Sequence, residues 1–412
     1  MNIERLTLPN GLRVIHHRDQ SAAMAAVNVL YDVGARDESA EMTGIAHLFE
    51  HLMFGGSVNI PDFDAPLESA GGTSNAWTGN DFTNFYDILP AHNIETAFWL
   101  ESDRMISPSL TEESVAVQKN VVIEEFKQTS LNRPYGDTMH HLRAMAYKVH
   151  PYRWPVIGIS PEQIAAVTPE DARRFFMSHY GPSTAVLSVS GNVDTDRVFR
   201  LAEKWFGDIP GRVTVPRKLP AEPDQTEARR LTVTADVPAT TLTIAYKMSG
   251  RNAPQYPAAD ILTDILASGR SSYFYRDLLL KTGLFTEIDA SILGCEDPGL
   301  LLINARLTGD DDRTVADAEK VITDNLERIV RDGIPERRLQ RALNRYESNL
   351  TFSNISVDAR AAAIAMAEMQ GEHPDENLRR YRRLTADDIN RAAADIFRPE
   401  KSSTLLYKPL RS

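Results

Sequence analysis

The order of apolar and polar residues predicts strands mixed with helices. Apolar stretches with alternating polar positions at residues 25–31 and 184–190 are typical of strands. Spacing typical of helices follows at residues 44–54, 94–105, 112–128 and 169–178. Because these segments do not alternate as regular strand–helix–strand units, the pattern favours an α+β fold.

The two halves of the chain look like copies of each other. Residues 168–171 (Thr-Pro-Glu-Asp) precede an aromatic-x-Pro step at 180–182, and residues 385–388 (Thr-Ala-Asp-Asp) precede the same step at 397–399. The offset is 217 at both ends, as 385 − 168 and 399 − 182. In each copy a capped helix leads into a closing strand, which indicates a duplicated domain.

A change of composition marks the predicted boundary between the copies. Pro210, Pro216, Pro220 and Pro223 stand among charged residues, which is the composition of a linker. We therefore expect an N-terminal domain over residues 1–209, a linker over 210–228 and a C-terminal homologous domain over 229–412.

Composition and charge exclude several classes of protein. The 412 residues are 42% hydrophobic, enough for ordinary packed cores, and no apolar run approaches the length of a membrane span. The net charge of −12 and the pI near 5.4 argue against a nucleic-acid footprint. Cys295 is the only cysteine, so an internal disulfide and a thiolate metal cluster are excluded. Any metal must be held by histidine and carboxylate.

The segment His47-Leu48-Phe49-Glu50-His51 carries the clearest chemistry. On a helix, residues four apart lie one above the other, so both imidazoles can reach one metal ion. Glu50 then lies close enough to take a proton from water. This is the His-x-x-Glu-His order of an inverzincin, a class of zinc hydrolase.

A catalytic zinc site needs a third protein ligand, which should be a carboxylate from another element. The predicted helix over 112–128 offers Glu124 and Glu125. Adjacent helical residues differ by about 100° in direction, so only one of the two can point at the metal.

The second copy lacks these ligands. At an offset near 214, residues 46–52 correspond to residues 260–266, and both imidazoles are replaced by isoleucine, Ile261 and Ile265. We therefore expect metal chemistry in the first copy only.

The chain resembles the insulinase/pitrilysin metallopeptidases, particularly the short two-domain type related to mitochondrial processing peptidase. The resemblance covers nearly the whole chain. Its landmarks are residues 8–12 (Leu-Pro-Asn-Gly-Leu), 44–51, 71–76 (Gly-Gly-Thr-Ser-Asn-Ala), 121–125, 132–136 and 150–152. The fold it implies has two homologous domains, each a mostly antiparallel β-sheet layered with α-helices.

The resemblance also implies roles for individual residues. It selects Glu125 over Glu124 as the third ligand, so that His47, His51 and Glu125 bind one Zn2+ per chain. Glu50 is then the general base. Asn75 and Ala76 are similar to the family's edge strand, which binds an extended peptide substrate by strand addition.

One departure from the family's pattern bears on partners. Relatives place an Arg and a Tyr in the second domain, where this chain has Leu279 and Thr286. We therefore expect the zinc-bearing subunit of a heterodimer, whose paralogous partner supplies the Arg/Tyr pair and closes the chamber; a homodimer is the weaker expectation. The alternative function is a non-catalytic scaffold or assembly subunit of the same fold.

The expected substrate and location follow from the same resemblance. Peptide degradation or processing ranks above the processing of organellar targeting sequences, because residues 1–14 form a polar strand and turn without the features of a leader. We expect a bacterial cytoplasmic protein, or a periplasmic one if a leader was removed.

Overall fold

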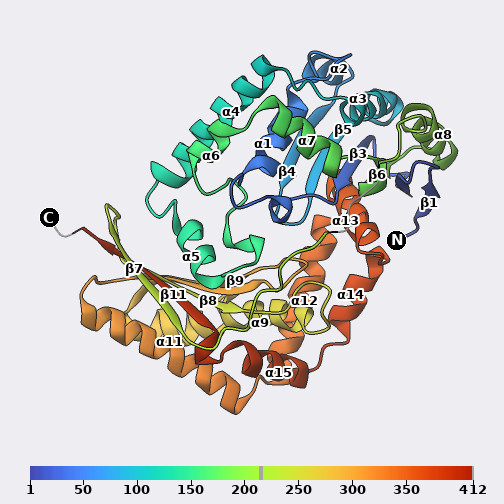
Figure 1. Cartoon of the computed structure of the whole chain (residues 1–412). Helices are drawn as coiled ribbons and strands as arrows, with labels where there is room; N and C mark the ends of the chain where they lie inside the picture. Colours follow the sequence, from blue (N-terminus) through green and yellow to red (C-terminus); the bar gives the residue numbers. More distant parts are fainter. Residues whose placement is uncertain (213–216, 411–412) are drawn as a thin grey trace. The chain divides into compact units, whose positions relative to one another are not determined.

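The computed structural model describes residues 1–212 and 217–410. Its helices and strands group into two compact units (Figure 1). Unit 1 comprises Met1–Lys127, Trp154–Leu219 and Leu350–Asn377, and unit 2 comprises Gln128–Arg153, Pro220–Asn349 and Leu378–Ser412. The fold is α+β, as predicted.

Unit 1 is built on a six-stranded sheet with the order β1-β2-β6-β3-β5-β4. All neighbouring strands are antiparallel except β2 and β6. The strands are β1 (Glu4–Thr7), β2 (Arg13–Arg18), β3 (Met24–Tyr31), β4 (Thr73–Thr78), β5 (Thr83–Pro90) and β6 (Ala185–Gly191). The helices are α1 (Ile45–Phe54), α2 (Asp64–Ser69), α3 (Glu95–Ile106), α4 (Glu112–Phe126), α6 (Pro161–Ala166), α7 (Pro169–His179), α8 (Thr195–Phe206) and α13 (Val357–Met369).

Unit 2 is built on a five-stranded sheet with the order β7-β11-β8-β10-β9, in which only β7 and β11 are parallel. Its strands are β7 (Arg229–Ala235), β8 (Thr241–Lys247), β9 (Phe285–Leu293), β10 (Leu300–Leu307) and β11 (Ser402–Pro409). Its helices are α5 (Thr138–Ala146), α9 (Tyr256–Ala267), the π-helix η6 (Phe274–Leu279), α10 (Leu280–Thr282), α11 (Asp312–Asp332), α12 (Glu336–Ser353) and α15 (Ala386–Ile396). Two helices run across a boundary between the units, α12 after Asn349 and α14 (Pro374–Arg382) after Asn377.

The internal repeat is visible in the topology and in the caps. The order β7-β11-β8-β10-β9 reproduces β2-β6-β3-β5-β4, with the parallel pair in the same place. Thr168 and Thr385 cap α7 and α15 through the same capping box with an aspartate three residues on. Each helix is followed by a short 3₁₀ turn and then by the strand that lies second in this shared order. The similarity read from the sequence is therefore confirmed.

The central strands of each sheet are buried on both faces, because each half of the chain contributes a helix to the other half's unit (Figure 1). In unit 1 one face packs against α1, α3 and α8, while α13 covers the other and buries Ile364 against Leu30 and Val186. In unit 2, α5 covers the face opposite α9, α11 and α15, and buries Leu142 against Leu405. The compact units thus differ from the division at residues 210–228 by these two exchanged segments.

The segment expected to be a linker is held on both sides of the boundary at Leu219 and Pro220. In unit 1 the Arg217 guanidinium pairs with Asp37 and Asp32. In unit 2 the buried Glu222 carboxylate accepts backbone hydrogen bonds from residues 148–150 and pairs with Lys247. Part of the expected linker, residues 213–216, lies outside the described residues.

Candidate active site

Helix α1 presents the histidines because its apolar face is fixed in the core of unit 1. Leu48, Phe49 and Leu52 are fully buried. The side chains of His47 and His51 emerge from the other face, 13% and 24% exposed. The predicted helix over 44–54 is confirmed, and with it the placement of the two imidazoles one turn apart.

The start of α1 is fixed by a glutamate that precedes it. Gly44 lies before the helix with φ of 86°, and a Cβ there would come within 2.8 Å of the Ile157 carbonyl oxygen, so glycine is required. Since Gly44 has no side chain to cap the helix, the Glu38 carboxyl accepts the N–H groups of Gly44 and Ala46 at 3.0 and 2.9 Å. Burial raises the pKa of Glu38 to about 8, against the opposing effect of these hydrogen bonds.

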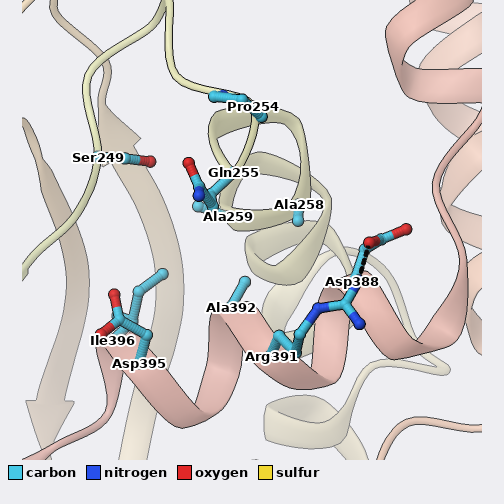
Figure 2. A pocket seen from close by; sticks show the side chains of 10 residues that line it. All are labelled: Ser249, Pro254, Gln255, Ala258, Ala259, Asp388, Arg391, Ala392, Asp395 and Ile396. Atoms are coloured by element: carbon cyan, nitrogen blue, oxygen red, sulfur yellow. Dashed lines mark hydrogen bonds and ion pairs between the residues drawn. The ribbon is translucent and has the colours of Figure 1, made fainter.

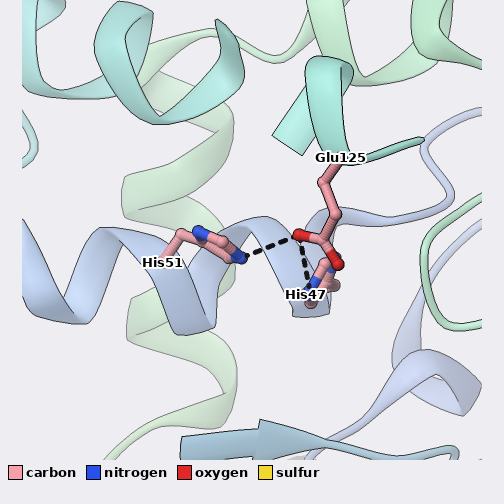
Figure 3. Close-up of side chains that lie close together, drawn as sticks. All are labelled: His47, His51 and Glu125. Carbon is pink, nitrogen blue, oxygen red and sulfur yellow. Dashed lines mark ion pairs between the residues drawn. The ribbon is translucent and has the colours of Figure 1, made fainter. Parts of the chain in front are cut away.

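Helix α4 supplies the third candidate ligand, Glu125 (Figure 3). The Glu125 Oε2 lies 3.4 Å from His51 Nε2 and 3.8 Å from His47 Nε2. The neighbouring Glu124 is exposed and pairs with Lys127 at 2.7 Å. The geometry therefore agrees with the choice of Glu125, because only this carboxylate points toward the imidazoles.

These three side chains fit a zinc ion. Their ligand atoms all lie within 4.8 Å of one another. Donor atoms around one tetrahedral zinc lie about 3.4 Å apart, given zinc–ligand bonds of about 2.1 Å, and the two separations from Glu125 are close to this value. Burial lowers the pKa of His47 to about 4, so its imidazole is neutral near pH 7, as a metal ligand must be.

Glu50 lies beside the ligand set but is held by a different partner. Its Oε2 accepts a hydrogen bond from the Thr78 hydroxyl at the end of β4. Burial raises the pKa of the Glu50 carboxyl, and the Thr78 hydrogen bond and the nearby His51 lower it. A partly buried carboxylate with a raised pKa and a fixed orientation suits proton transfer.

Asn75 and Ala76 lie on β4, the edge strand of the sheet in unit 1. Asn75 faces solvent, whereas Ala76 packs against the core. The Ala76 N–H donates to the Asn75 side-chain oxygen at 2.8 Å, which satisfies a backbone group on this strand without a neighbouring strand. An extended peptide pairing with β4 would replace this local bond by a strand-to-strand one.

The equivalent of this site in unit 2 is apolar. Ile261 and Ile265 of α9 are buried in the core of unit 2. Leu279 packs against the same core at the end of η6, and the Thr286 hydroxyl of β9 donates to the Arg306 carbonyl oxygen. Neither position offers the guanidinium or the phenol expected from the family's pattern.

Two residues of the site, Glu38 and Thr78, were not predicted from the sequence. Glu38 lies seven residues before the first residue of the helix it caps, so no local capping pattern indicates it; the signal was the glycine at the helix start, which requires a cap from elsewhere. Thr78 lies 28 residues from Glu50, and its contact depends on the packing of β4 against α1.

Models of known protein families match both halves of the chain. The family model described as Insulinase (Peptidase family M16) matches residues 13–158, and that described as Peptidase M16 inactive domain matches residues 166–346. The chain is 29% identical over 417 residues to the zinc protease PqqE of Helicobacter pylori, covering 98% of this chain and 93% of that protein.

Solved structures agree over the whole length. The crystal structure of a protease from Helicobacter pylori superposes with a TM-score of 0.92 at 27% identity and covers 99% of both chains. A crystal structure described as the peptidase M16 inactive domain from Pseudomonas fluorescens has a TM-score of 0.88 at 16% identity, covering 100% of this chain and 99% of that one. At that identity the second match shows a shared fold and nothing more.

Proposed function

Because the chain belongs to the insulinase family of peptidases, peptidase family M16, we propose that it is a zinc metalloendopeptidase of the His-x-x-Glu-His type. The observation that carries the proposal is the convergence of His47, His51 and Glu125 from two helices, with Glu50 beside them. A relative named a zinc protease over nearly the full length supports it.

In this proposal each side chain has a distinct task. His47, His51 and Glu125 would hold zinc, a Lewis acid that polarises the scissile carbonyl and a water molecule. Glu50 takes a proton from the attacking water and passes it to the leaving amine. Thr78 orients the Glu50 carboxylate during both transfers. Strand β4, with Asn75 and Ala76, pairs with the peptide through its backbone, which favours extended substrates of loose sequence preference.

We further propose that a paralogous subunit completes the active site and encloses it in a chamber. Leu279 and Thr286 cannot supply the guanidinium and phenol that stabilise the developing oxyanion in relatives. A heterodimeric partner carrying that Arg/Tyr pair would restore this stabilisation.

A non-catalytic scaffold of the same fold is the second candidate. The missing Arg/Tyr pair favours it. Against it stands the intact ligand set, since a scaffold has no physical need for three ligands at metal-binding distances.

Zinc analysis and peptide cleavage by the purified chain test these alternatives. We expect about one zinc per chain, lost in His51→Ala, and cleavage of a quenched fluorescent peptide that a chelator and Glu50→Gln both abolish. Zinc without activity would support the heterodimer, and activity would return with the partner. A chain without zinc would refute the peptidase. Robust cleavage by the chain alone would refute the need for a partner.

A further inference from the structure

Two surface pockets lined by described residues of unit 2 differ in character. The first, of about 440 Å³, lies between the start of α9 and α15 (Figure 2). Its charged groups are already matched, because Asp388 pairs with Arg391 and also caps α15. The charged groups of this pocket therefore serve the fold of unit 2 and do not indicate a ligand.

The second pocket, of about 710 Å³, is lined by arginine. Arg337, Arg338 and Arg341 come from the first turns of α12, and Arg276 from η6. The remaining lining residues are Ser271, Pro335, Gln340 and Asn344. Among the described residues, no residue that lines this pocket carries a carboxylate, and none of the four guanidinium groups forms an ion pair.

Two of these arginines are fixed in place by their surroundings. Arg338 donates to the Ser271 carbonyl oxygen at 2.8 Å, and its guanidinium carbon lies 3.8 Å from the centre of the Tyr273 ring. Arg341 donates to the Ser271 hydroxyl. These contacts use a part of the five N–H donors on each guanidinium and leave the rest for a ligand.

The cluster opposes the stability of its own helix. Arg337 and Arg338 are the second and third residues of α12, where the helix dipole disfavours positive charge. Arg341 lies one turn from both, so the side chains repel each other. Burial and the charges of Arg338 and Arg345 lower the pKa of Arg341, and Asp264 alone among its main influences acts in the opposite direction. A chain of net charge −12 thus concentrates unpaired cations where they cost stability.

We propose that this pocket, formed by Arg276, Arg337, Arg338 and Arg341, is a binding site for a compact oligophosphate anion. Arginine matches phosphate oxygens with paired N–H donors, and a fixed guanidinium loses little freedom on binding. A triphosphate carries three to four charges in a short chain and can satisfy all four side chains at once. Carboxylates on one face of an extended peptide recur only every second residue, about 7 Å apart, so a peptide brings fewer charges into the same volume.

Calorimetric titration of sodium tripolyphosphate into the full chain tests the proposal, at about 0.15 M ionic strength to screen nonspecific attraction. We expect saturable binding at one site per chain, weakened about tenfold or more in Arg337→Gln/Arg341→Gln. The matched control is Arg313→Gln/Arg331→Gln, which removes two exposed charges from α11 of the same unit and should bind like the unchanged chain. The melting temperature of the first variant should be unchanged or higher, because repulsion within α12 is relieved.

Three further titrations define the ligand. The first titration uses ATP. Binding of ATP at least as tight as that of tripolyphosphate supports a nucleotide as the ligand of the pocket, and weaker binding of ATP supports a free oligophosphate. Because oligophosphates chelate zinc, the titration is repeated on His51→Ala; binding that disappears in this variant would be chelation and would overturn the proposal. A hexa-aspartate peptide that binds as tightly as tripolyphosphate would overturn the ligand class. Equal binding by the two double variants would overturn the site itself. None of these outcomes depends on peptidase activity.

Discussion

Replacing Glu222 by glutamine should destabilise unit 2 near neutral pH. The Glu222 side chain is 3% exposed, and its carboxylate accepts the N–H groups of residues 148, 149 and 150 at 2.8, 3.0 and 3.0 Å. The Lys247 ammonium lies 2.9 Å away. Glutamine keeps the shape and one acceptor oxygen but removes the charge and the second acceptor.

The magnitude follows from the pKa of this group. Burial by itself would raise the pKa of Glu222, but the three backbone hydrogen bonds and Lys247 lower it from 4.5 to about 2. Each pKa unit corresponds to about 1.4 kcal/mol, so the folded state gains about 3 kcal/mol from the ionised form. Because the folded pKa is depressed, this stabilisation is complete above pH 4.5 and is lost as the pH falls toward 2.

Hydrogen exchange and urea unfolding measure the effect. At pH 7 we expect faster exchange of the amides of residues 148–150 in Glu222→Gln and a loss of about 2–3 kcal/mol in the unfolding of unit 2. The difference between the two proteins should narrow as the pH falls below 4.5. Glu227→Gln, at an exposed carboxylate nearby, is the matched control and should leave both measurements unchanged.

Two results would refute this reasoning. Unchanged exchange of these amides at pH 7 would show that the carboxylate does not hold the segment. A stability difference that persists undiminished at pH 3 would show that the ionised form is not its source.

Three further predictions concern the site and the exchanged helices. Glu50→Gln should lower kcat/KM for peptide cleavage by about 10²- to 10⁴-fold while zinc content stays the same; lost zinc would point to a ligand role instead. Glu125→Gln should lose zinc and Glu124→Gln should keep it, as elemental analysis would show; the reverse result would assign the ligand to Glu124. Ile364→Ala should destabilise unit 1 by about 2–5 kcal/mol in urea unfolding, because Ile364 is fully buried, whereas Ile355→Ala, at a side chain 67% exposed, should change stability by less than about 0.5 kcal/mol.

The sequence predicted the parts of this structure that depend on local spacing. The helix carrying His47 and His51 and the helix carrying Glu125 follow from residues a few positions apart, as do the caps at Thr168 and Thr385. The contact of Thr78 with Glu50 could not be predicted in this way, since it joins a strand and a helix that only tertiary packing brings together.

The same limit applies to the predicted linker. Its proline-rich composition led us to expect a linker between two domains, but composition does not show that a carboxylate such as Glu222 will be buried. It also gave no indication that α5 and α13 would each pack in the other half's unit, because the sequence of a helix that covers a sheet does not specify which sheet it covers.

The exchange of α5 and α13 makes the two units interdependent in folding. The chain passes from one unit to the other five times, after Lys127, Arg153, Leu219, Asn349 and Asn377. A gene split at the predicted linker would yield fragments that each hold a complete sheet with one apolar face bare. Such fragments could reach the native state only by reciprocal complementation, each donating its helix to the other. Unlike tandem repeats that fold independently, these two domains are therefore inseparable as folding units.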